Sequence, residues 1–436
     1  MEKYQPVIGL EIHIQLNTNR KMFCNCANNI WGKKPNTVVC PVCLGLPGAL
    51  PVANGEAIKK CQMFGLALNC KLSTKSNFDR KHYFYHDLPK GYQISQYKTP
   101  FCYNGYVSLT QGKVDIVRIH LEEDTAKSIH SSKTNSTLVD FNKSGVPLME
   151  IVTAPVIKSA EHAVEYAKKV AQIAEFIGVS NVNMERGNLR VEPSISVRKI
   201  GDTKLPNYKV ELKNINSFKF MKQAIEYEIN RQINELEEGS IIKQQTRGWN
   251  ENKKITFEQR TKESEADYRY FAEPDIPPFK FSKKYLQDIK KSLPKLPEQV
   301  VSEFVNKYKV PNSKIEELLR LSRLDEAELL IEAGLDSVVA VNIVISATEK
   351  IREQIKNNPK QFVTNYKNEE SKKINSELDL QPIINEVITQ NQKSVQDYKS
   401  GKNPKAIDFL VGQVMRLSKG SANPLVAREL LEKNLS

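Results

Sequence analysis

Four short segments of this chain place carboxylates, and in one case a histidine, inside patterns typical of β-strands. From Val7 to Leu16 apolar and polar side chains alternate, so Glu11 and His13 would share one face of a strand. The other three segments carry Glu123, Glu150 and Glu192. Carboxylates and one imidazole held on strands predict a hard-cation site of the kind that organises phosphates. The alternative is a set of solvated strand faces.

Glu123 belongs to a run of three consecutive carboxylates, Glu122 to Asp124. In a strand, Glu123 would share a face with Ile119 and Leu121, and these apolar neighbours indicate the core. A buried carboxylate must be paired, protonated or bound to a metal. Glu150 lies inside an apolar run in the same way. Glu192 would share its face with two serines and two arginines, namely Arg190, Ser194, Ser196 and Arg198.

Seven cysteines are present, and four of them form two close pairs. Cys24 and Cys26 are separated by one residue, and Cys40 and Cys43 by two, with thirteen residues between the pairs. This spacing predicts a structural zinc ribbon over residues 22–46. Disulfides and unliganded thiols are the alternatives, although nothing in the sequence indicates an oxidising compartment. Three further cysteines read as small core residues: Cys61, Cys70 and Cys102.

Residues 79–96 mix basic and aromatic side chains. Arg80 and Lys81 are candidates for binding phosphates, and three tyrosines are candidates for stacking on bases: Tyr83, Tyr85 and Tyr92. The alternative for this stretch is a strand with an aromatic core face. Arg269, in the segment Asp267 to Phe271, is either a phosphate contact or a buried structural arginine.

The composition is that of a globular protein of several domains: 436 residues, 40% apolar and 26% charged. No run approaches the roughly 20 apolar residues that a membrane span needs. A strand-like pattern begins by Val7, which leaves no room for a targeting peptide and favours the cytoplasm, or an organelle after processing. The net charge of +13 comes largely from residues 1–100, with thirteen Lys and Arg against five Asp and Glu. This excess suits RNA phosphates, unless it only reflects a lysine-rich composition.

The periodicity predicts an α+β fold. Short alternating strands dominate residues 5–290 and predict a mixed, mostly antiparallel sheet, with helices over 160–177 and 218–238. Beyond the prolines at 294 and 297 the pattern turns helical. Residues 352–375 are rich in polar side chains and are expected to form a solvated hinge or frayed helix. Two helices should close the chain, over 405–417 and from Pro424 onwards with Asn423 as cap.

The motifs occur in an order that resembles a known family. They are VIGLEIHIQL, FDRKHYFY, GYQISQ, HLEEDTAK, SGVPLMEIVT, VELKNINSF, DYRYFAEPDIPP and FLVGQVMRLSKGSANP, spread nearly end to end. The chain is similar to the GatB family, one of the subunits of the tRNA-dependent amidotransferases. The resemblance implies a kinase-like cradle domain over residues 1–293, a shortened helical domain over 294–375 and a small helical tail domain over 376–436 that binds tRNA.

The resemblance also implies an activity. The GatB-type chain would use ATP to phosphorylate the side-chain carboxylate of misacylated Glu-tRNA(Gln) or Asp-tRNA(Asn), and would then transfer ammonia to it. The ammonia would come from a glutaminase, the amidase partner, with a third, small partner completing the complex. Mg²⁺ would be held by Glu11, His13, Glu123 and Glu150. Glu192 stands where the family usually has aspartate. Phosphate contacts of the tail would come from basic residues near Gly420, namely Arg416, Lys419 and Arg428.

The competing hypothesis is a zinc-ribbon RNA-binding scaffold whose acidic residues are structural and which has no catalytic activity of its own. An archaeal paralogue specific for tRNA(Gln) is less favoured, because it carries a large inserted domain that is not evident here. The chain contains no nucleophile elbow and no glycine-rich phosphate loop. Glutamine hydrolysis is therefore expected from another chain.

Overall fold

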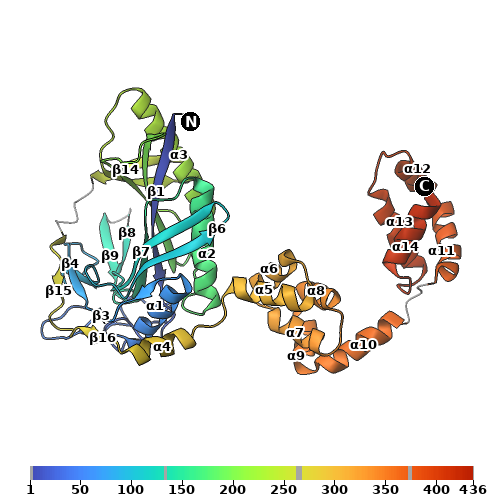
Figure 1. Ribbon diagram of the computed structural model, residues 1–436, viewed down its shortest axis with the longest axis horizontal. Coiled ribbons are helices and arrows are strands. Elements are labelled where there is room, and N and C mark those ends of the chain that lie inside the picture. Colours follow the sequence, from blue (N-terminus) through green and yellow to red (C-terminus); the bar gives the residue numbers. More distant parts are fainter. Residues whose placement is uncertain (1–2, 132–134, 262–267, 372–375, 436) are drawn as a thin grey trace. The chain divides into compact units, whose positions relative to one another are not determined.

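The structure, a computed structural model, describes residues 3–131, 135–261, 268–371 and 376–435. The chain forms two compact units, Met1–Pro297 and Glu298–Ser436. The first contains all the strands of the described residues and four helices, and the second contains helices (Figure 1). The α+β class predicted from the periodicity is confirmed.

A nine-stranded sheet is the framework of the first unit, in the order β14-β13-β12-β11-β1-β10-β7-β6-β2. Neighbouring strands are antiparallel throughout, except for the parallel pair β12 and β13. The expected mixed, mostly antiparallel sheet is therefore confirmed. In chain order its strands are β1 (Tyr4–Gln15), β2 (Lys71–Leu72), β6 (Cys102–Leu109), β7 (Gly112–Glu123), β10 (Pro147–Thr153), β11 (Leu189–Lys199), β12 (Val210–Lys213), β13 (Gln245–Asn250) and β14 (Ile255–Thr261).

The two faces of this sheet have different chemistry. On one face, helices α1 (Gly55–Ala67), α2 (Ala160–Phe176) and α3 (Phe218–Glu237) pack against the strands. The alternating apolar residues of β1 point to this side, and Ile8, Ile12 and Ile14 are fully buried there. The opposite face carries the polar residues of the same strands, so the alternation in the sequence decides which residues reach the site.

The helix boundaries follow the local sequence. Ser159 and Ser217 cap α2 and α3, their hydroxyls accepting from the amides of His162 and Phe220. Both helices agree with the ranges predicted from the periodicity to within one residue. A fourth helix, α4 (Lys283–Lys291), ends the first unit.

Three small sheets complete the first unit. Strands β4 (Asp79–His82), β5 (Tyr92–Ser95) and β15 (Phe271–Ala272) form one of them, and β5 contacts β7 of the large sheet. This contact is made by hydrogen bonds from Gln93 to the Glu123 carbonyl and from Ser95 to the Glu122 carboxylate. The others are β3 (Lys75–Ser76) with β16 (Phe279–Lys280), and the hairpin of β8 (Lys127–Ser131) with β9 (Ser136–Asp140).

The second unit contains two separate clusters of buried apolar residues. The first cluster spans Phe304 to Val363 and lies among α5 (Pro297–Tyr308), α6 (Asn312–Arg320), α7 (Leu324–Glu332), α8 (Ser337–Ser346), α9 (Glu349–Asn357) and α10 (Pro359–Ser371). The second spans Leu380 to Leu435 and lies among α11 (Glu377–Gln390), α12 (Gln392–Lys399), α13 (Ala406–Leu417) and α14 (Pro424–Leu435). The domain limits at 293 and 375 stay predictions.

Of the two alternatives expected for residues 352–375, a solvated hinge or a frayed helix, the hinge is wrong over most of the segment, which is helical. Residues up to 371 continue α9 and form α10, and residues 372–375 lie outside the described part of the chain. Polar composition is misleading here, because a few apolar residues anchor these helices: Ile355 and Val363 are buried, and Ile351, Phe362 and Tyr366 pack against the same cluster. The two closing helices are confirmed. Within the described residues, no helix is long and apolar enough to cross a membrane.

Candidate functional site

Three neighbouring strands bring two histidines and two carboxylates together on the open face of the large sheet. The register pairs His13 of β1 with Glu150 of β10, and Glu150 with His120 of β7. Nε2 of His13 lies 3.3 Å from a carboxylate oxygen of Glu150 and 3.7 Å from one of Glu122. Nε2 of His120 lies 3.3 Å from the same oxygen of Glu150. The four side chains form a single buried polar cluster.

The donors of this cluster fit a divalent cation. One ligand atom each from His13, Glu122 and Glu150 lies within 4.8 Å of the others. Burial lowers the pKa of His13, but Glu150, Glu192 and Glu122 outweigh it and raise the pKa to about 9. Burial raises the pKa of Glu150, and His120 and His13 outweigh it and hold the pKa well below its ordinary value. A potential that attracts a proton this strongly would equally attract a hard cation, whose binding would release the proton.

The three consecutive carboxylates of residues 122–124 enter three different environments. Glu122 faces the cluster. Glu123 points to the opposite face, where its carboxylate pairs with Lys90 and accepts from the Ile94 amide at 2.9 Å. Asp124 accepts from Gln15, Lys143 and Arg190. The structure does not bring Glu123 together with His13 and Glu150.

The sequence contains the signal for this arrangement. Strand alternation places Arg118, His120 and Glu122 on the face opposite Ile119 and Leu121. Three polar residues on one face of a strand indicate a site better than a single carboxylate on the apolar face. Glu123 is chosen from the sequence because a carboxylate on an apolar face is unusual. His120 and Glu122 are the site residues that the sequence reasoning missed.

Glu11 belongs to a second acidic group beside the first. It lies within ligand distance of Glu192 and Glu211, with the three oxygens within 4.8 Å of one another. The ammonium of Lys213 pairs with Glu192 at 2.7 Å and with Glu211 at 3.0 Å. Burial lowers the pKa of Lys213, but Glu192 and Glu211 outweigh it and raise the pKa. This group therefore already holds the ammonium of a lysine.

Both acidic groups line one cavity of about 600 Å³. Lys81, Arg118 and Arg190 bring positive charge to its wall, and Tyr83, Tyr97, Tyr268 and Tyr270 line it as well. Burial lowers the pKa of Lys81, but Glu122, Tyr270 and Glu150 outweigh it and raise the pKa well above its ordinary value. Lys81 therefore remains a cation at neutral pH.

The other basic and aromatic candidates lie in different places. Arg80 pairs with Glu273 at 2.7 Å and with Asp275 at 3.1 Å, and its guanidinium lies 4.3 Å from the ring centre of Tyr92. Tyr85 is 59% exposed. Arg269 has φ of 43°, and its backbone carbonyl lies 3.2 Å from Nδ1 of His82. Of the set named from sequence, Lys81 and Tyr83 line the cavity. Asp267 lies outside the described residues.

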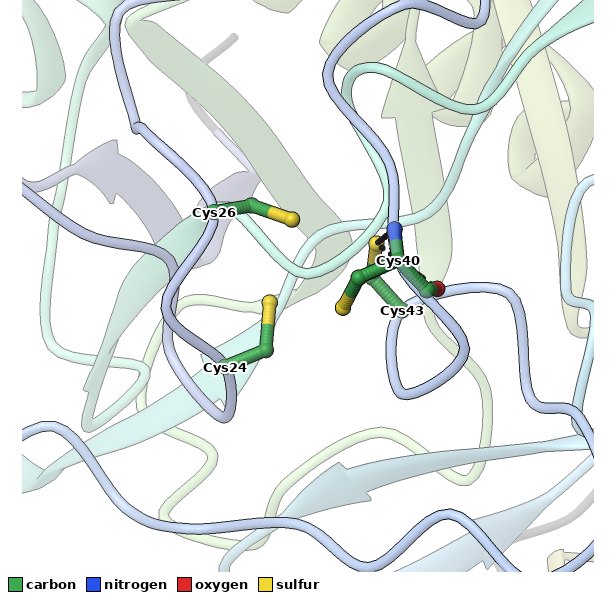
Figure 2. A group of neighbouring side chains, drawn as sticks. All are labelled: Cys24, Cys26, Cys40 and Cys43. Atoms are coloured by element: carbon green, nitrogen blue, oxygen red, sulfur yellow. Dashed lines mark hydrogen bonds between the residues drawn. The ribbon is translucent and has the colours of Figure 1, made fainter.

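The four clustered cysteines form a second candidate metal site. Figure 2 shows their sulfur atoms facing one another from two loops, and all four lie within 4.8 Å of each other. The Cys40 amide donates to Sγ of Cys43 at 3.2 Å. Hydrogen bonds from Cys24 and the Cys40 amide lower the pKa of Cys43 to about 4. A thiolate among four converging sulfurs fits a tetrahedral Zn²⁺ site.

The prediction of a ribbon is wrong in one respect. Residues 22–46, all of which are described, form turns and bends and contain no strand, apart from a single bridge between Arg20 and Ala27. The loops are held instead by side chains, including the buried Lys21, whose ammonium donates to the Val38 carbonyl at 2.9 Å. None of the seven cysteines, all of which are described, forms a disulfide. Cys61, Cys70 and Cys102 are buried in the core, as predicted.

Comparisons with known proteins show the family of the chain. Residues 6–287 match the model of the GatB/GatE catalytic domain, and residues 282–435 match that of the GatB domain. The GatB subunit of the aspartyl/glutamyl-tRNA(Asn/Gln) amidotransferase from Thermoanaerobacter pseudethanolicus is 43% identical over 477 aligned positions that cover 100% of both chains. The one from Thermotoga maritima is 40% identical over 482 positions and 99% of each chain. The first unit is thus a catalytic domain of this class. The chain belongs to the GatB family of aspartyl/glutamyl-tRNA(Asn/Gln) amidotransferase subunits.

The same alignments bear on the length of the chain. They span 477 and 482 positions, against 436 residues in this sequence. The relatives therefore carry segments that this chain lacks. The alignment lengths do not say where these segments lie, so the expected shortening of the helical domain over residues 294–375 stays a prediction.

Proposed function

We propose that this chain activates the side-chain carboxylate of misacylated Glu-tRNA(Gln) or Asp-tRNA(Asn) with ATP and then forms the amide. The observation that carries the proposal is the cavity in which His13, Glu122 and Glu150 converge beside Lys81. A carboxylate is a poor electrophile, so a site for its activation must bind a triphosphate and an anion together. A buried cluster for a divalent cation next to the partly buried ammonium group of Lys81 meets that requirement.

The cation-binding group differs from the set that the resemblance implies. His13, Glu122 and Glu150 would hold Mg²⁺, with Glu11 reaching it through water from the neighbouring acidic group. Bound there, Mg²⁺ would neutralise phosphate charge and orient the triphosphate. Glu123, which has its own partner in Lys90, supports β7 from behind the site in this proposal.

The chain's own residues then have defined tasks. Lys81 donates hydrogen bonds to phosphate oxygens of ATP. Arg190 neutralises negative charge on the other substrate, which carries the carboxylate. One oxygen of the substrate carboxylate attacks the γ-phosphorus, and ADP leaves with the electron pair of the broken phosphorus–oxygen bond. The nitrogen of ammonia attacks the acyl carbon, inorganic phosphate leaves with the electron pair of the broken carbon–oxygen bond, and the departing phosphate takes up the proton that the nitrogen loses. Tyr83 and Tyr270 keep water from the acyl phosphate.

The proposal also assigns roles to partner proteins and to parts of this chain away from the cavity. Ammonia comes from a partner glutaminase, the amidase of the complex, and a third, small protein completes the heterotrimer. Zn²⁺ at the four cysteines is structural. The helices of residues 376–436 contact the body of the tRNA through phosphate groups.

The experiment compares Glu122→Gln and Glu150→Gln in the assembled complex. Each change keeps the side-chain shape and removes one charge, so ATP hydrolysis stimulated by misacylated tRNA should fall roughly 100-fold or more in both. Glutaminase activity measured without tRNA should survive. Glu237→Gln, on the exposed surface of α3, is the matched control. If Glu150→Gln hydrolyses ATP like the unmodified complex, the site assigned to His13, Glu122 and Glu150 is wrong. If the unmodified complex shows no ATP hydrolysis stimulated by misacylated tRNA, the proposed activity is wrong and the RNA-binding scaffold is favoured.

A further inference from the structure

Arg118 of β7 lines the cavity at His13 and has no task in the proposed function. Strand alternation puts it on the same face as His120 and Glu122. The cavity is lined by five lysines and arginines: Lys81, Arg118, Arg190, Lys209 and Lys213. Arg190 and Lys213 are bound to carboxylates, at 3.1 and 2.7 Å. Arg118 makes no ion pair or hydrogen bond with any described residue, so its charge is available to a ligand.

The strand register places Arg118 next to the cation-binding cluster. On β10, Val152 lies opposite Arg118 and Glu150 lies opposite His120. Glu150 is therefore a diagonal neighbour of Arg118 on one face of the sheet, and such neighbours are roughly 7 Å apart, within reach of a long side chain. In the structure, however, Glu150 contacts His13 and His120 instead. The guanidinium of Arg118 is thus available to an anion that also contacts the cluster.

Two tyrosines fix the position of this guanidinium. Cζ of Arg118 lies 5.9 Å from the ring centre of Tyr97, and a cation at this distance is attracted to the face of the ring. The Tyr97 ring is itself stacked on Tyr270, with ring centres 4.5 Å apart. The backbone amide of Tyr97 donates to the carboxylate of the buried Asp79 at 2.8 Å. Nε of Arg118 is buried, so a ligand would contact the two terminal nitrogens.

A fixed, unpaired guanidinium beside a cluster for a divalent cation suits an anion with several oxygens. The terminal nitrogens of an arginine form a planar fork that donates two hydrogen bonds to a phosphate. A carboxylate would fit the same fork, but a phosphoryl group in transfer spreads its charge over three oxygens. The divalent cation and Arg118 could contact such a group from two sides. Because the tyrosines hold the fork before the substrate binds, little reorganisation is needed during the reaction.

We propose that Arg118 is a catalytic residue that contacts the γ-phosphoryl group while it passes from ATP to the substrate carboxylate. This inference rests on the proposed function and adds a residue to it. An oxygen of the carboxylate forms a bond to phosphorus, the bond from phosphorus to the bridging oxygen of ADP breaks, and its electron pair stays with ADP. Arg118 donates hydrogen bonds to the nonbridging oxygens and keeps its protons. It therefore stabilises the transition state more than bound ATP.

The first test measures kinetics in the assembled complex. Arg118→Ala should lower kcat for ATP hydrolysis stimulated by misacylated tRNA roughly 100-fold or more and change the KM for ATP less than about threefold. Arg118→Lys keeps the charge without the fork and should recover only part of the loss. Added guanidinium ion should restore part of the activity of Arg118→Ala and none of that of Glu122→Gln. Should Arg118→Ala not fold, Arg118→Lys carries the comparison.

Arg186→Ala is the matched control for these measurements. Arg186 also lies over an aromatic ring, 4.8 Å from the ring centre of Trp31, but it is exposed and is not among the residues that line the cavity at His13. Its removal should leave kcat unchanged. If the unmodified complex hydrolyses ATP and Arg118→Ala has the same kcat as Arg186→Ala, the role of Arg118 is overturned and the proposed function stands.

The second test does not depend on turnover. ADP with Mg²⁺ and aluminium fluoride imitates the phosphoryl group in transfer, whereas ADP with Mg²⁺ lacks that group. In calorimetric titrations of the assembled complex, Arg118→Ala should weaken binding of the aluminium fluoride complex roughly 100-fold and binding of ADP only slightly. Equal weakening of both ligands, or of neither, would overturn the role of Arg118. If this difference is found but the unmodified complex hydrolyses no ATP with misacylated tRNA, only the proposed function fails.

Discussion

The cysteine cluster and the cluster at His13 are two candidate metal sites built in opposite ways. The four cysteines come from residues 24–43, and their sulfurs face one another. His13, Glu122 and Glu150 come from three strands that are far apart in the sequence, and they line a large cavity. A set of ligands that fills its own coordination sphere suits a structural ion. A set that leaves one side open suits an ion that binds substrate.

The largest effect should come from removing a cysteine ligand. Cys40→Ser should abolish Zn²⁺ binding and loosen residues 22–46, because metal binding supplies about 10 kcal/mol or more of folding free energy to such sites. Metal analysis by mass spectrometry and limited proteolysis measure both effects. Cys70→Ala, a buried cysteine outside the cluster, is the control. Should the unmodified protein, purified without chelator, contain no zinc, the comparison between a closed and an open site would fail.

The next effect separates two adjacent carboxylates. Glu123→Gln should lower the free energy of unfolding by roughly 3 kcal/mol, because it leaves the largely buried Lys90 without its charge partner. Binding of Mg²⁺ to the folded protein should change little. Glu122→Gln should do the opposite and weaken Mg²⁺ binding with little effect on unfolding. Chemical denaturation and calorimetric titration of Mg²⁺ measure the two quantities.

The reverse result would be equally clear. If Glu123→Gln removed Mg²⁺ binding and Glu122→Gln did not, Glu123 would be the ligand, as the sequence pattern suggests. The face assigned to the site on β7 would then be wrong.

These cases explain what the sequence could and could not predict. Cys24 and Cys43 are close in sequence, so spacing alone places their thiols together. The sheet and its helices follow from local periodicity, and the two cysteine pairs follow from their spacing. The set at His13 depends on the register of β1, β10 and β7, which brings Glu150 opposite both His13 and His120. The local sequence pattern does not determine that register. It also does not decide whether Glu122 or Glu123 faces the site.

A third buried carboxylate tests the same distinction in the second unit. Glu326 is 2% exposed and is bound by Arg352 at 2.7 Å and Lys356 at 3.1 Å. It is paired by protein cations, as Glu123 is, and lines no cavity described above. Glu326→Gln should therefore cost about 2–3 kcal/mol of stability and leave ATP hydrolysis unchanged.

The pH dependence of this pair follows from its pKa. Burial raises the pKa of Glu326, but hydrogen bonds from Arg352 and Lys356 outweigh it, and the folded-state pKa is lowered. A lowered pKa contributes stability above the unfolded value of about 4.3, and this contribution is lost as the pH falls through the folded value. The difference in stability between Glu326→Gln and the unmodified protein should therefore shrink below about pH 4. If the difference in the free energy of unfolding stayed constant from neutral pH to below the unfolded-state pKa of about 4.3, the ion pairing assigned to Glu326 would be wrong.

The smallest effect concerns exposed charges at the end of the chain. Arg416 and Lys419 are exposed near Gly420, whereas Arg428 pairs with Asp408. Phosphate contacts by two exposed cations should add affinity for tRNA that weakens with salt. Arg416→Gln with Lys419→Gln should raise the KM for misacylated tRNA a few fold at low salt, less at high salt, with kcat unchanged. Arg320→Gln with Lys307→Gln, 70% and 60% exposed in the same unit, is the charge-matched control. Neither Arg416 nor Lys419 belongs to the buried cluster of these helices, so the double variant should fold normally. Equal KM values for the two double variants at every salt concentration would mean that this surface does not contact tRNA.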